Sequence, residues 1–177
     1  MICPPDVFDA AGALFYRNAA NGAFMFTSRY RLSDSESLFQ TASMYPDVFK
    51  PRPAESHKGT YGTLAVIGGA EGMSGAVVLA ATAAAYAGCG KVWAGFNQRQ
   101  LPFAVIDGRP EIMLATAQNL LLRNDADARA VGCGLGLGET ASGIVAAALS
   151  EADGKPLLLD ADALTLLSHS SELQRLA

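Results

Sequence analysis

The stretch "TLAVIGGAEGMSGAVVLAATAAAYAG", residues 63 to 88, joins a short apolar run to an alanine-rich segment through several glycines. An apolar run of this length that ends in glycine is typical of a strand buried in a parallel sheet. The alanine-rich segment is long enough for about three helical turns, and Gly88 is a suitable C-cap. Small side chains allow such a helix to pack closely against the sheet. The stretch therefore predicts one strand–loop–helix unit of an α/β fold.

The same pattern recurs along the rest of the chain. Apolar runs in "KVWAGF", "PEIMLAT", "ARAVGCGLG" and "PLLLDADAL" alternate with helical segments such as "ETASGIVAAALSEADG". Strands that alternate with helices form βαβ units, which place a parallel sheet between two layers of helices. We therefore expect a three-layer α/β/α fold. Its parallel strands are predicted at 63–68, 91–96, 129–133 and 156–160, and its helices at 75–88 and 140–152.

The composition limits the classes of function. The chain has 177 residues, of which 50% are hydrophobic and 17% charged, and its formal net charge is −4. This charge argues against a nucleic-acid partner, which needs a clustered basic face. The uncharged run 72–90 is too rich in alanine and glycine for a membrane span, and the amino terminus lacks the basic start of a secretory signal. Cys3, Cys89 and Cys133 have no metal-ligand spacing, so we expect free thiols in a reducing cytoplasm rather than a zinc site.

The first part of the chain differs from the rest. Residues 1–36 show no sustained hydrophobic period and predict a leader that is disordered or forms a weakly attached helix. The segment "SESLFQTASMYPDVF" has the spacing of a capping box and predicts a short helix that Pro46 ends. The two prolines of "KPRPAES" predict an extended linker. We therefore expect a leader over 1–36 and one α/β domain over 37–177.

Two glycine loops follow predicted strands. The first, residues 68–75, precedes a predicted helix whose free N–H groups and dipole favour an anion. It matches neither the Walker A loop nor the dinucleotide fingerprint, and glycines needed only for the turn are an equal alternative. The second loop is "GCGLGLG", residues 132–138. Because ligands of open parallel sheets bind beyond the carboxyl ends of the strands, the two loops are predicted to form two walls of one crevice.

Charged residues near these segments are weaker candidates. Asp160 and Asp162 follow a predicted strand and could orient a hydroxyl or hold Mg²⁺ through water. The alternative for Asp162 is that it caps a helix beginning at Ala163. Lys58 could pair with a phosphate, whereas His57 is more simply an exposed loop residue.

Taken in order, five motifs resemble one family: "SHKGTYG", "GGAEGMSGAVVLAATAAAYAGCGKV", "RPEIM", "GCGLG" and "LLLDADAL". They resemble the ADP- or ATP-dependent NAD(P)H-hydrate dehydratases, the carbohydrate-kinase-like repair enzymes of the ribokinase-like superfamily. The resemblance implies that residues 37–177 form the amino-terminal, substrate-side portion of a ribokinase-like domain. It also implies the activity: a nucleotide phosphorylates the hydroxyl of the hydrated nicotinamide ring, and phosphate then leaves as the double bond reforms.

The resemblance implies site residues, cofactors and partners. Gly75 and Ala76 would contact the hydrate from the first loop and Gly134 from the second, with Lys58 and Asp160 at the same crevice. The implied cofactors are ADP or ATP with Mg²⁺, and the implied partners are the NAD(P)H hydrate and the nucleotide. A homo-oligomer in the cytoplasm is expected, with no nucleic-acid or membrane partner.

The chain departs from the family pattern in several places. Cys133 replaces a proline of the second loop, and Thr165 replaces an asparagine. The family's Thr-Pro-His-x-Gly-Glu motif, its lysine-glycine nucleotide loop and its Gly-Ser-Gly-Asp motif with the catalytic aspartate do not occur in these 177 residues. The resemblance therefore implies that the chain carries no catalytic base and is inactive alone. The alternatives are a small-molecule kinase of the same superfamily and a non-catalytic remnant that binds a ligand or partner.

Overall fold

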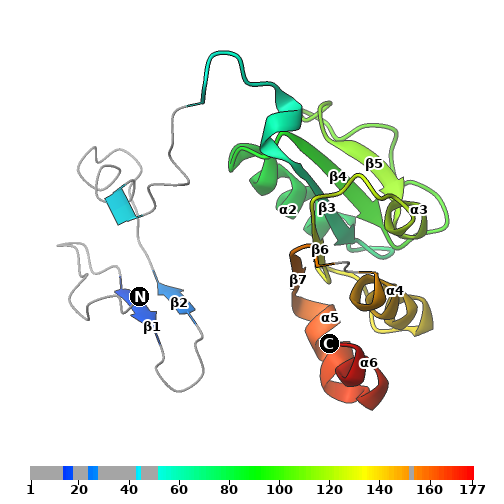
Figure 1. Cartoon of the computed structure of the whole chain (residues 1–177). Helices are drawn as coiled ribbons and strands as arrows, with labels where there is room; N and C mark the ends of the chain where they lie inside the picture. Colours follow the sequence, from blue (N-terminus) through cyan, green and yellow to red (C-terminus); the bar gives the residue numbers. More distant parts are fainter. Residues whose placement is uncertain (1–13, 18–23, 28–42, 45–51, 152–153) are drawn as a thin grey trace. The chain divides into compact units, whose positions relative to one another are not determined.

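The computed structural model describes residues 14–17, 24–27, 43–44, 52–151 and 154–177 (Figure 1). The chain divides into two units, Met1–Arg52 and Pro53–Ala177, and each is described by itself. In the first unit, β1 (Leu14–Arg17) pairs antiparallel with β2 (Phe24–Thr27). At these residues the structure has a strand pair in place of the expected helix, and the leader over 1–36 stays a prediction. The aromatic-rich runs favour strands, and the intervening sequence contains Asn21 and Gly22, a strong hairpin signal.

The predicted helix before Pro46 is described only at Ser43 and Met44, which are helical. The rest of that helix and the predicted boundary between residues 36 and 37 lie outside the described residues. The boundary between the two units falls inside "KPRPAES", the predicted linker.

The second unit contains one sheet of five parallel strands in the order β5-β4-β3-β6-β7 (Figure 1). The strands are β3 (Thr63–Gly68), β4 (Lys91–Phe96), β5 (Met113–Thr116), β6 (Ala128–Val131) and β7 (Leu157–Leu159). A 3₁₀ turn, η1 (Lys58–Tyr61), leads into β3. The predicted parallel strands are confirmed, with β3 and β4 at the predicted bounds and the other two slightly shorter than predicted.

Helices cover both faces of this sheet, so the three-layer α/β/α prediction is also confirmed. Alternate residues of β3 point to opposite faces: Val66 packs with α2 (Ser74–Tyr86), and Ile67 packs on the other side. The helices of that other side are α3 (Ala117–Leu121), α4 (Glu139–Ser150), α5 (Ala161–His169) and α6 (Ser171–Leu176). Helix α2 ends as expected, because Gly88 adopts φ +101° directly after the C-cap. Within the described ranges, no helix has the length and hydropathy needed to cross a bilayer.

The chain order of the strands creates a topological switch point. From β3 the chain moves through β4 to β5 on one side, and then returns to β6 and β7 on the other side of β3. Helices α2 and α4, which follow β3 and β6, therefore lie on opposite faces of the sheet. Ligands of open α/β sheets bind at such a point, beyond the carboxyl ends of the strands. Both glycine loops begin there.

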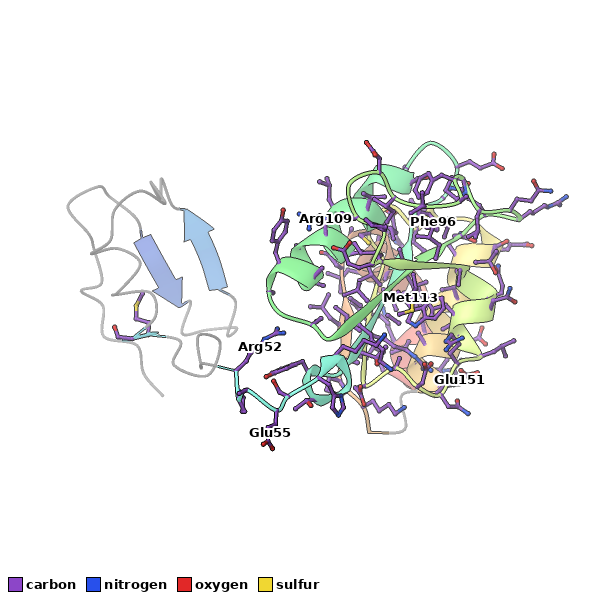
Figure 2. All side chains as sticks on the ribbon, turned by 90° about the horizontal axis from the view of Figure 1, so that it is seen from above. Arg52, Glu55, Phe96, Arg109, Met113 and Glu151 are labelled. Atoms are coloured by element: carbon purple, nitrogen blue, oxygen red, sulfur yellow. The ribbon has the colours of Figure 1, made fainter. Side chains whose placement is uncertain are left out.

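A buried arginine holds the opposite end of the helical layer. Arg129 in β6 is only 7% exposed. Its Nη1 donates to the carbonyl of Glu151, the C-cap of α4, at 3.0 Å (Glu151 is labelled in Figure 2). Its Nη2 donates at 3.4 Å to the carbonyls of Leu121, at the end of α3, and Arg123. The guanidinium thus satisfies carbonyls that helix ends leave unpaired, at the negative end of each helix dipole.

We expect Arg129→Ala to lower the free energy of unfolding by about 3 kcal/mol, because it removes the donor to one buried and two partly buried carbonyls and opens a cavity. Urea unfolding of the 177-residue chain measures this. Arg175→Ala is the matched control, since Arg175 is exposed on α6, and it should change stability by less than about 0.5 kcal/mol. Equal losses in the two variants would contradict a structural role for Arg129.

Candidate functional site at the ends of β3 and β6

The two glycine loops are joined by backbone hydrogen bonds. The N–H of Gly69 donates to the carbonyl of Cys133 at 3.0 Å, and the N–H of Ala70 donates to that of Gly134 at 2.7 Å. A side chain at Gly68 would place its Cβ 2.0 Å from the Cys133 oxygen, so only glycine permits this approach. The two loops, which the sequence predicts as two walls of one crevice, therefore lie directly against each other at the switch point.

Gly134 and Ala76, two of the predicted substrate-binding residues, are brought together on this surface. A Cβ on Gly134 would lie 3.1 Å from the Cβ of Ala76 and 2.9 Å from that of Met73. Gly134 also adopts φ +60°, a conformation that side chains with a Cβ rarely take. The second loop thus packs directly on the start of α2.

Gly75 has a different environment. It is the second residue of α2, its φ is not positive, and no atom lies within 4 Å of the position a Cβ would take. Neither packing nor backbone conformation therefore requires glycine here, although glycine costs a helix up to about 1 kcal/mol relative to alanine. The N–H groups of Ser74 and Gly75 have no hydrogen-bond partner among the described residues. This open helix start can accept an anion or a close-lying polar ligand.

Two residues that sequence reasoning missed hold these loops in place. Asn97 and Gln98 follow β4 directly. The Gln98 amide nitrogen donates to the Gly69 carbonyl and to Ser74 Oγ, both at 2.8 Å, and so ties the first loop to the start of α2. The Asn97 amide nitrogen donates at 2.8 Å to the carbonyl of Leu135 in the second loop. Both residues could have been found from the sequence, because they come immediately after a buried parallel strand, as Asp160 does.

The two aspartates after β7 have different roles. Helix α5 begins at Ala161, with Asp160 as its N-cap, so the prediction that Asp162 caps a helix beginning at Ala163 is wrong. Asp162 instead accepts the Gly136 N–H at 2.8 Å, from the first turn of α5. The physical reason is that the extended backbone of Asp160 already ends the strand and starts the helix.

Asp160 remains available at the same rim. Its carboxylate is exposed and makes no hydrogen bond with the described residues, and its carbonyl lies so close to Gly132 that a Cβ there would be 1.9 Å away. The adjacent Ala161 adopts φ +44°, an uncommon conformation for a residue other than glycine. Such backbone strain is concentrated at functional sites. The structure therefore places Asp160 beside the second glycine loop, as predicted from its position in the sequence.

Lys58 is not brought to this surface. It lies in η1, before β3, whereas the glycine loops lie after β3 and β6. A strand of six residues spans about 20 Å. Figure 2 shows Glu55, which precedes η1, and Phe96, at the carboxyl end of β4, on opposite sides of this unit. The expectation that Lys58 shares the crevice with Gly134 is corrected accordingly, because the strand direction places it at the opposite end of the sheet.

His57 has a structural role at that opposite end. Its Nδ1 accepts the Gly59 N–H at 3.1 Å, and the Thr60 hydroxyl accepts the His57 N–H at 3.3 Å. The two residues thus form a capping box around η1.

The pKa of the Cys133 thiol depends on burial and on the charges around the second loop. Burial raises its pKa, and the neighbouring carboxylates of Asp160 and Asp162 raise the pKa further. Burial alone raises the pKa of Cys89. Both thiols are therefore expected to remain protonated at pH values where an exposed cysteine begins to ionise.

We expect Cys133 to react with iodoacetamide more slowly than an exposed cysteine peptide at pH 8. Asp160→Asn should accelerate this reaction a few-fold, because it removes a negative charge that disfavours the thiolate. Mass spectrometry of each alkylated cysteine gives the rates, and Cys89 is the internal control, since Asp160 is not among the causes of its shift. An unchanged rate at Cys133 in Asp160→Asn would contradict the proximity of the carboxylate.

The comparisons with known proteins agree with this geometry. A carbohydrate-kinase family model, described as NAD(P)H-hydrate dehydratase, matches residues 64–177, a range that includes both glycine loops and the β7 aspartates. The chain belongs to the NAD(P)H-hydrate dehydratase family. Its relatives include the ADP-dependent (S)-NAD(P)H-hydrate dehydratase of Neisseria meningitidis, which is 61% identical over 140 residues, 79% of this chain and 47% of that protein. The enzyme of the same description from Lactiplantibacillus plantarum is 37% identical over 68% of this chain and 45% of its own length.

Solved structures support the same assignment. The ADP/ATP-dependent NAD(P)H-hydrate dehydratase of Bacillus subtilis, co-crystallized with ATP/Mg²⁺, has a TM-score of 0.56 and 34% identity, and the match covers 64% of this chain and 42% of that one. A ribokinase-like superfamily protein of Enterococcus faecalis has a TM-score of 0.61 and 27% identity, and the match covers 68% of this chain and 44% of that one. The ribokinase-like fold is therefore confirmed. The chain spans about half the length of these NAD(P)H-hydrate dehydratase relatives.

Proposed function

We propose that this chain supplies the substrate-binding half of a nucleotide-dependent NAD(P)H-hydrate dehydratase. The hydrate lies over the joined glycine loops, in contact with Gly75, Ala76 and Gly134. The observation that carries the proposal is Gly75, a helical glycine that neither packing nor conformation requires. A ligand that approaches the backbone closely explains it, and the N–H groups of Ser74 and Gly75, which have no partner in the described part of the chain, lie at the same place.

The proposed reaction repairs a hydrated nicotinamide ring. Hydroxide is a poor leaving group, so the nucleotide transfers its terminal phosphoryl group to the ring hydroxyl. Phosphate then departs as a proton is removed and the double bond reforms. Catalysis of phosphoryl transfer depends mainly on positioning and on charge stabilisation. The residues of this chain contribute the positioning: a rigid surface of backbone N–H groups and small side chains holds the hydrate.

The nucleotide and the metal are part of the same proposal. Relatives are named as ADP-dependent or were co-crystallized with ATP/Mg²⁺, and we propose ADP or ATP with Mg²⁺ for this chain. Mg²⁺ is usually held by one or two carboxylates, by waters and by the phosphates of the substrate. Asp160 fits this requirement, because its exposed carboxylate lies beside the second loop and has no partner among the residues that the structure describes. The described residues contain no cluster of three potential ligands, so this part of the chain would supply only that carboxylate.

Two further properties belong to the proposal. A cytoplasmic location suits the free thiols of Cys89 and Cys133. A homo-oligomer suits β7, which is an edge strand whose Leu158 side chain is 58% exposed.

We expect Gly75→Val to weaken the binding of NADH hydrate at least tenfold, because the new side chain fills the space over the helix start. Folding stability should be unchanged or slightly increased, since valine has a better helix propensity than glycine. Isothermal titration calorimetry and urea unfolding measure the two effects.

The matched control is Gly143→Val. Gly143 is also an exposed helical glycine with nothing within 4 Å of its Cβ position, but it lies in α4. Its replacement should leave the affinity unchanged. Equal affinities of wild type and Gly75→Val would remove the start of α2 from the binding site.

A further inference from the structure

One peptide group of the second glycine loop is held from both sides. Asn97 donates its amide nitrogen to the carbonyl of Leu135 at 2.8 Å. The next N–H in the chain, that of Gly136, donates to a carboxylate oxygen of Asp162 at 2.8 Å. This carbonyl and this N–H belong to the same planar peptide unit, which links Leu135 to Gly136. Two side chains therefore determine which way a single peptide plane faces.

The two side chains come from distant parts of the fold. Asn97 follows β4, and Asp162 lies in the first turn of α5, after β7. In the sheet, β4 and β7 lie on either side of the central pair β3 and β6, whose ends carry the glycine loops. The contacts link residues 38 and 26 positions apart in the sequence. Neither contact is part of a local turn, because each joins residues that are far apart in the sequence.

The peptide needs such support because it could turn over. Gly136 has φ +84°, and glycine also accepts the mirror-image region, so rotation of this peptide unit meets little steric resistance. The side chain of Leu135 is fully buried and anchors one end of the unit. The hydrogen bonds of Asn97 and Asp162 distinguish the two orientations of the plane. A carbonyl accepts and an N–H donates, so an amide donor on one side and a carboxylate acceptor on the other select one of them.

We propose that Asn97 and Asp162 are positioning residues that fix the Leu135–Gly136 peptide, and with it the part of the second loop that contacts the substrate. This inference rests on the proposed function of the loops. The fixed peptide follows Gly134, which lies against Met73 and Ala76 at the start of α2. If the plane turned over, the direction of the backbone on both sides of it would change, and the surface offered to the hydrate would change with it.

Exchanging the two partners tests the orientation itself. In Asn97→Asp, carboxylates flank the peptide on both sides. The Leu135 carbonyl therefore faces a carboxylate in either orientation and has no donor. In the double variant Asn97→Asp with Asp162→Asn, the peptide can turn over and regain both hydrogen bonds in the opposite sense. We expect exchange of the Gly136 amide proton, followed by NMR on the ¹⁵N-glycine-labelled 177-residue chain, to become about tenfold faster in Asn97→Asp. It should return close to the wild-type rate in the double variant.

Binding of NADH hydrate should behave differently from exchange. Both Asn97→Asp and the double variant should bind about tenfold more weakly than wild type, because a peptide held the wrong way round is ordered but misplaced. If the two side chains only stabilised the fold, the double variant would regain wild-type affinity for the hydrate as well as slow exchange of the Gly136 amide proton. Asn119→Asp, which makes the same change of charge at an exposed position of α3, should alter neither quantity.

Three results would overturn the inference. The first is a wild-type Gly136 amide that exchanges as fast as that of Gly72, whose surroundings are open. The second is a double variant no better protected than Asn97→Asp. The third is wild-type affinity in the double variant together with restored protection. Failure of the wild-type chain to bind the hydrate at all would reject the proposed function and the positioning role, while the exchange rates would still decide whether the two side chains hold the peptide.

Discussion

Replacement of Gly134 by valine is expected to abolish measurable binding of NADH hydrate and to lower the free energy of unfolding by about 3 kcal/mol. Valine strongly disfavours the φ of +60° that Gly134 adopts, and its Cβ would lie 2.9 Å from that of Met73. Backbone strain and overpacking each cost about 1–3 kcal/mol. The loop can relieve both only by moving away from the start of α2, which separates Gly134 from Ala76. Calorimetric titration and urea unfolding measure the two effects.

Gly108→Val is the control that separates the effect of backbone strain from an effect on the binding site. Gly108 has a similar φ of +67°, but nothing lies within 4 Å of its Cβ position, and it lies in the segment between β4 and β5. This variant should lose about 1–2 kcal/mol of stability from strain alone and keep its affinity for the hydrate. If Gly134→Val binds as tightly as Gly108→Val, the second loop does not contact the substrate.

The 177-residue chain alone is expected to show no dehydration of NADH hydrate with ADP or ATP. The chain contains no Gly-Ser-Gly-Asp motif, which carries the catalytic aspartate in the family pattern. Loss of general-base catalysis typically costs a factor of about 10²–10⁴, and the nucleotide site must be present as well. Absorbance at the reduced-nicotinamide band follows the reaction, with the Neisseria meningitidis relative as the positive control. Robust turnover by these residues alone would show that the catalytic groups lie within them.

The strands of the second unit could be predicted closely because each is a short apolar run, and three of them, β3, β6 and β7, end at or directly before a glycine or an aspartate. β3 and β4 match their predicted bounds, since their alternating residues are buried by helices on both faces. The first unit shows the opposite case. The apolar runs before and after Asn21 and Gly22 are short and show no regular hydrophobic alternation. The Asn-Gly pair was therefore the main sequence cue for the strand pair that the structure has there.

The site was only partly predictable. The positions of Gly134, Ala76 and Asp160 beyond strand carboxyl ends could be predicted from the strand–loop–helix pattern, whereas Lys58 precedes β3 and so lies at the other end of the sheet. The roles of Asn97 and Asp162 could not be deduced. Both act on the Leu135–Gly136 peptide through contacts that exist only after the sheet has assembled, and the local sequence around Asp162 resembles a helix cap.

The proposed function requires the hydrate to bind over the joined glycine loops at the ends of β3 and β6. Titration of the ¹⁵N-glycine-labelled chain with NADH hydrate tests it most directly, because glycines lie at both ends of the sheet. We expect the largest changes in amide chemical shift at Gly72, Gly75 and Gly134. Changes confined to Gly59, Gly62 and Gly90, which lie at the opposite end beside η1 and the start of β4, would contradict it.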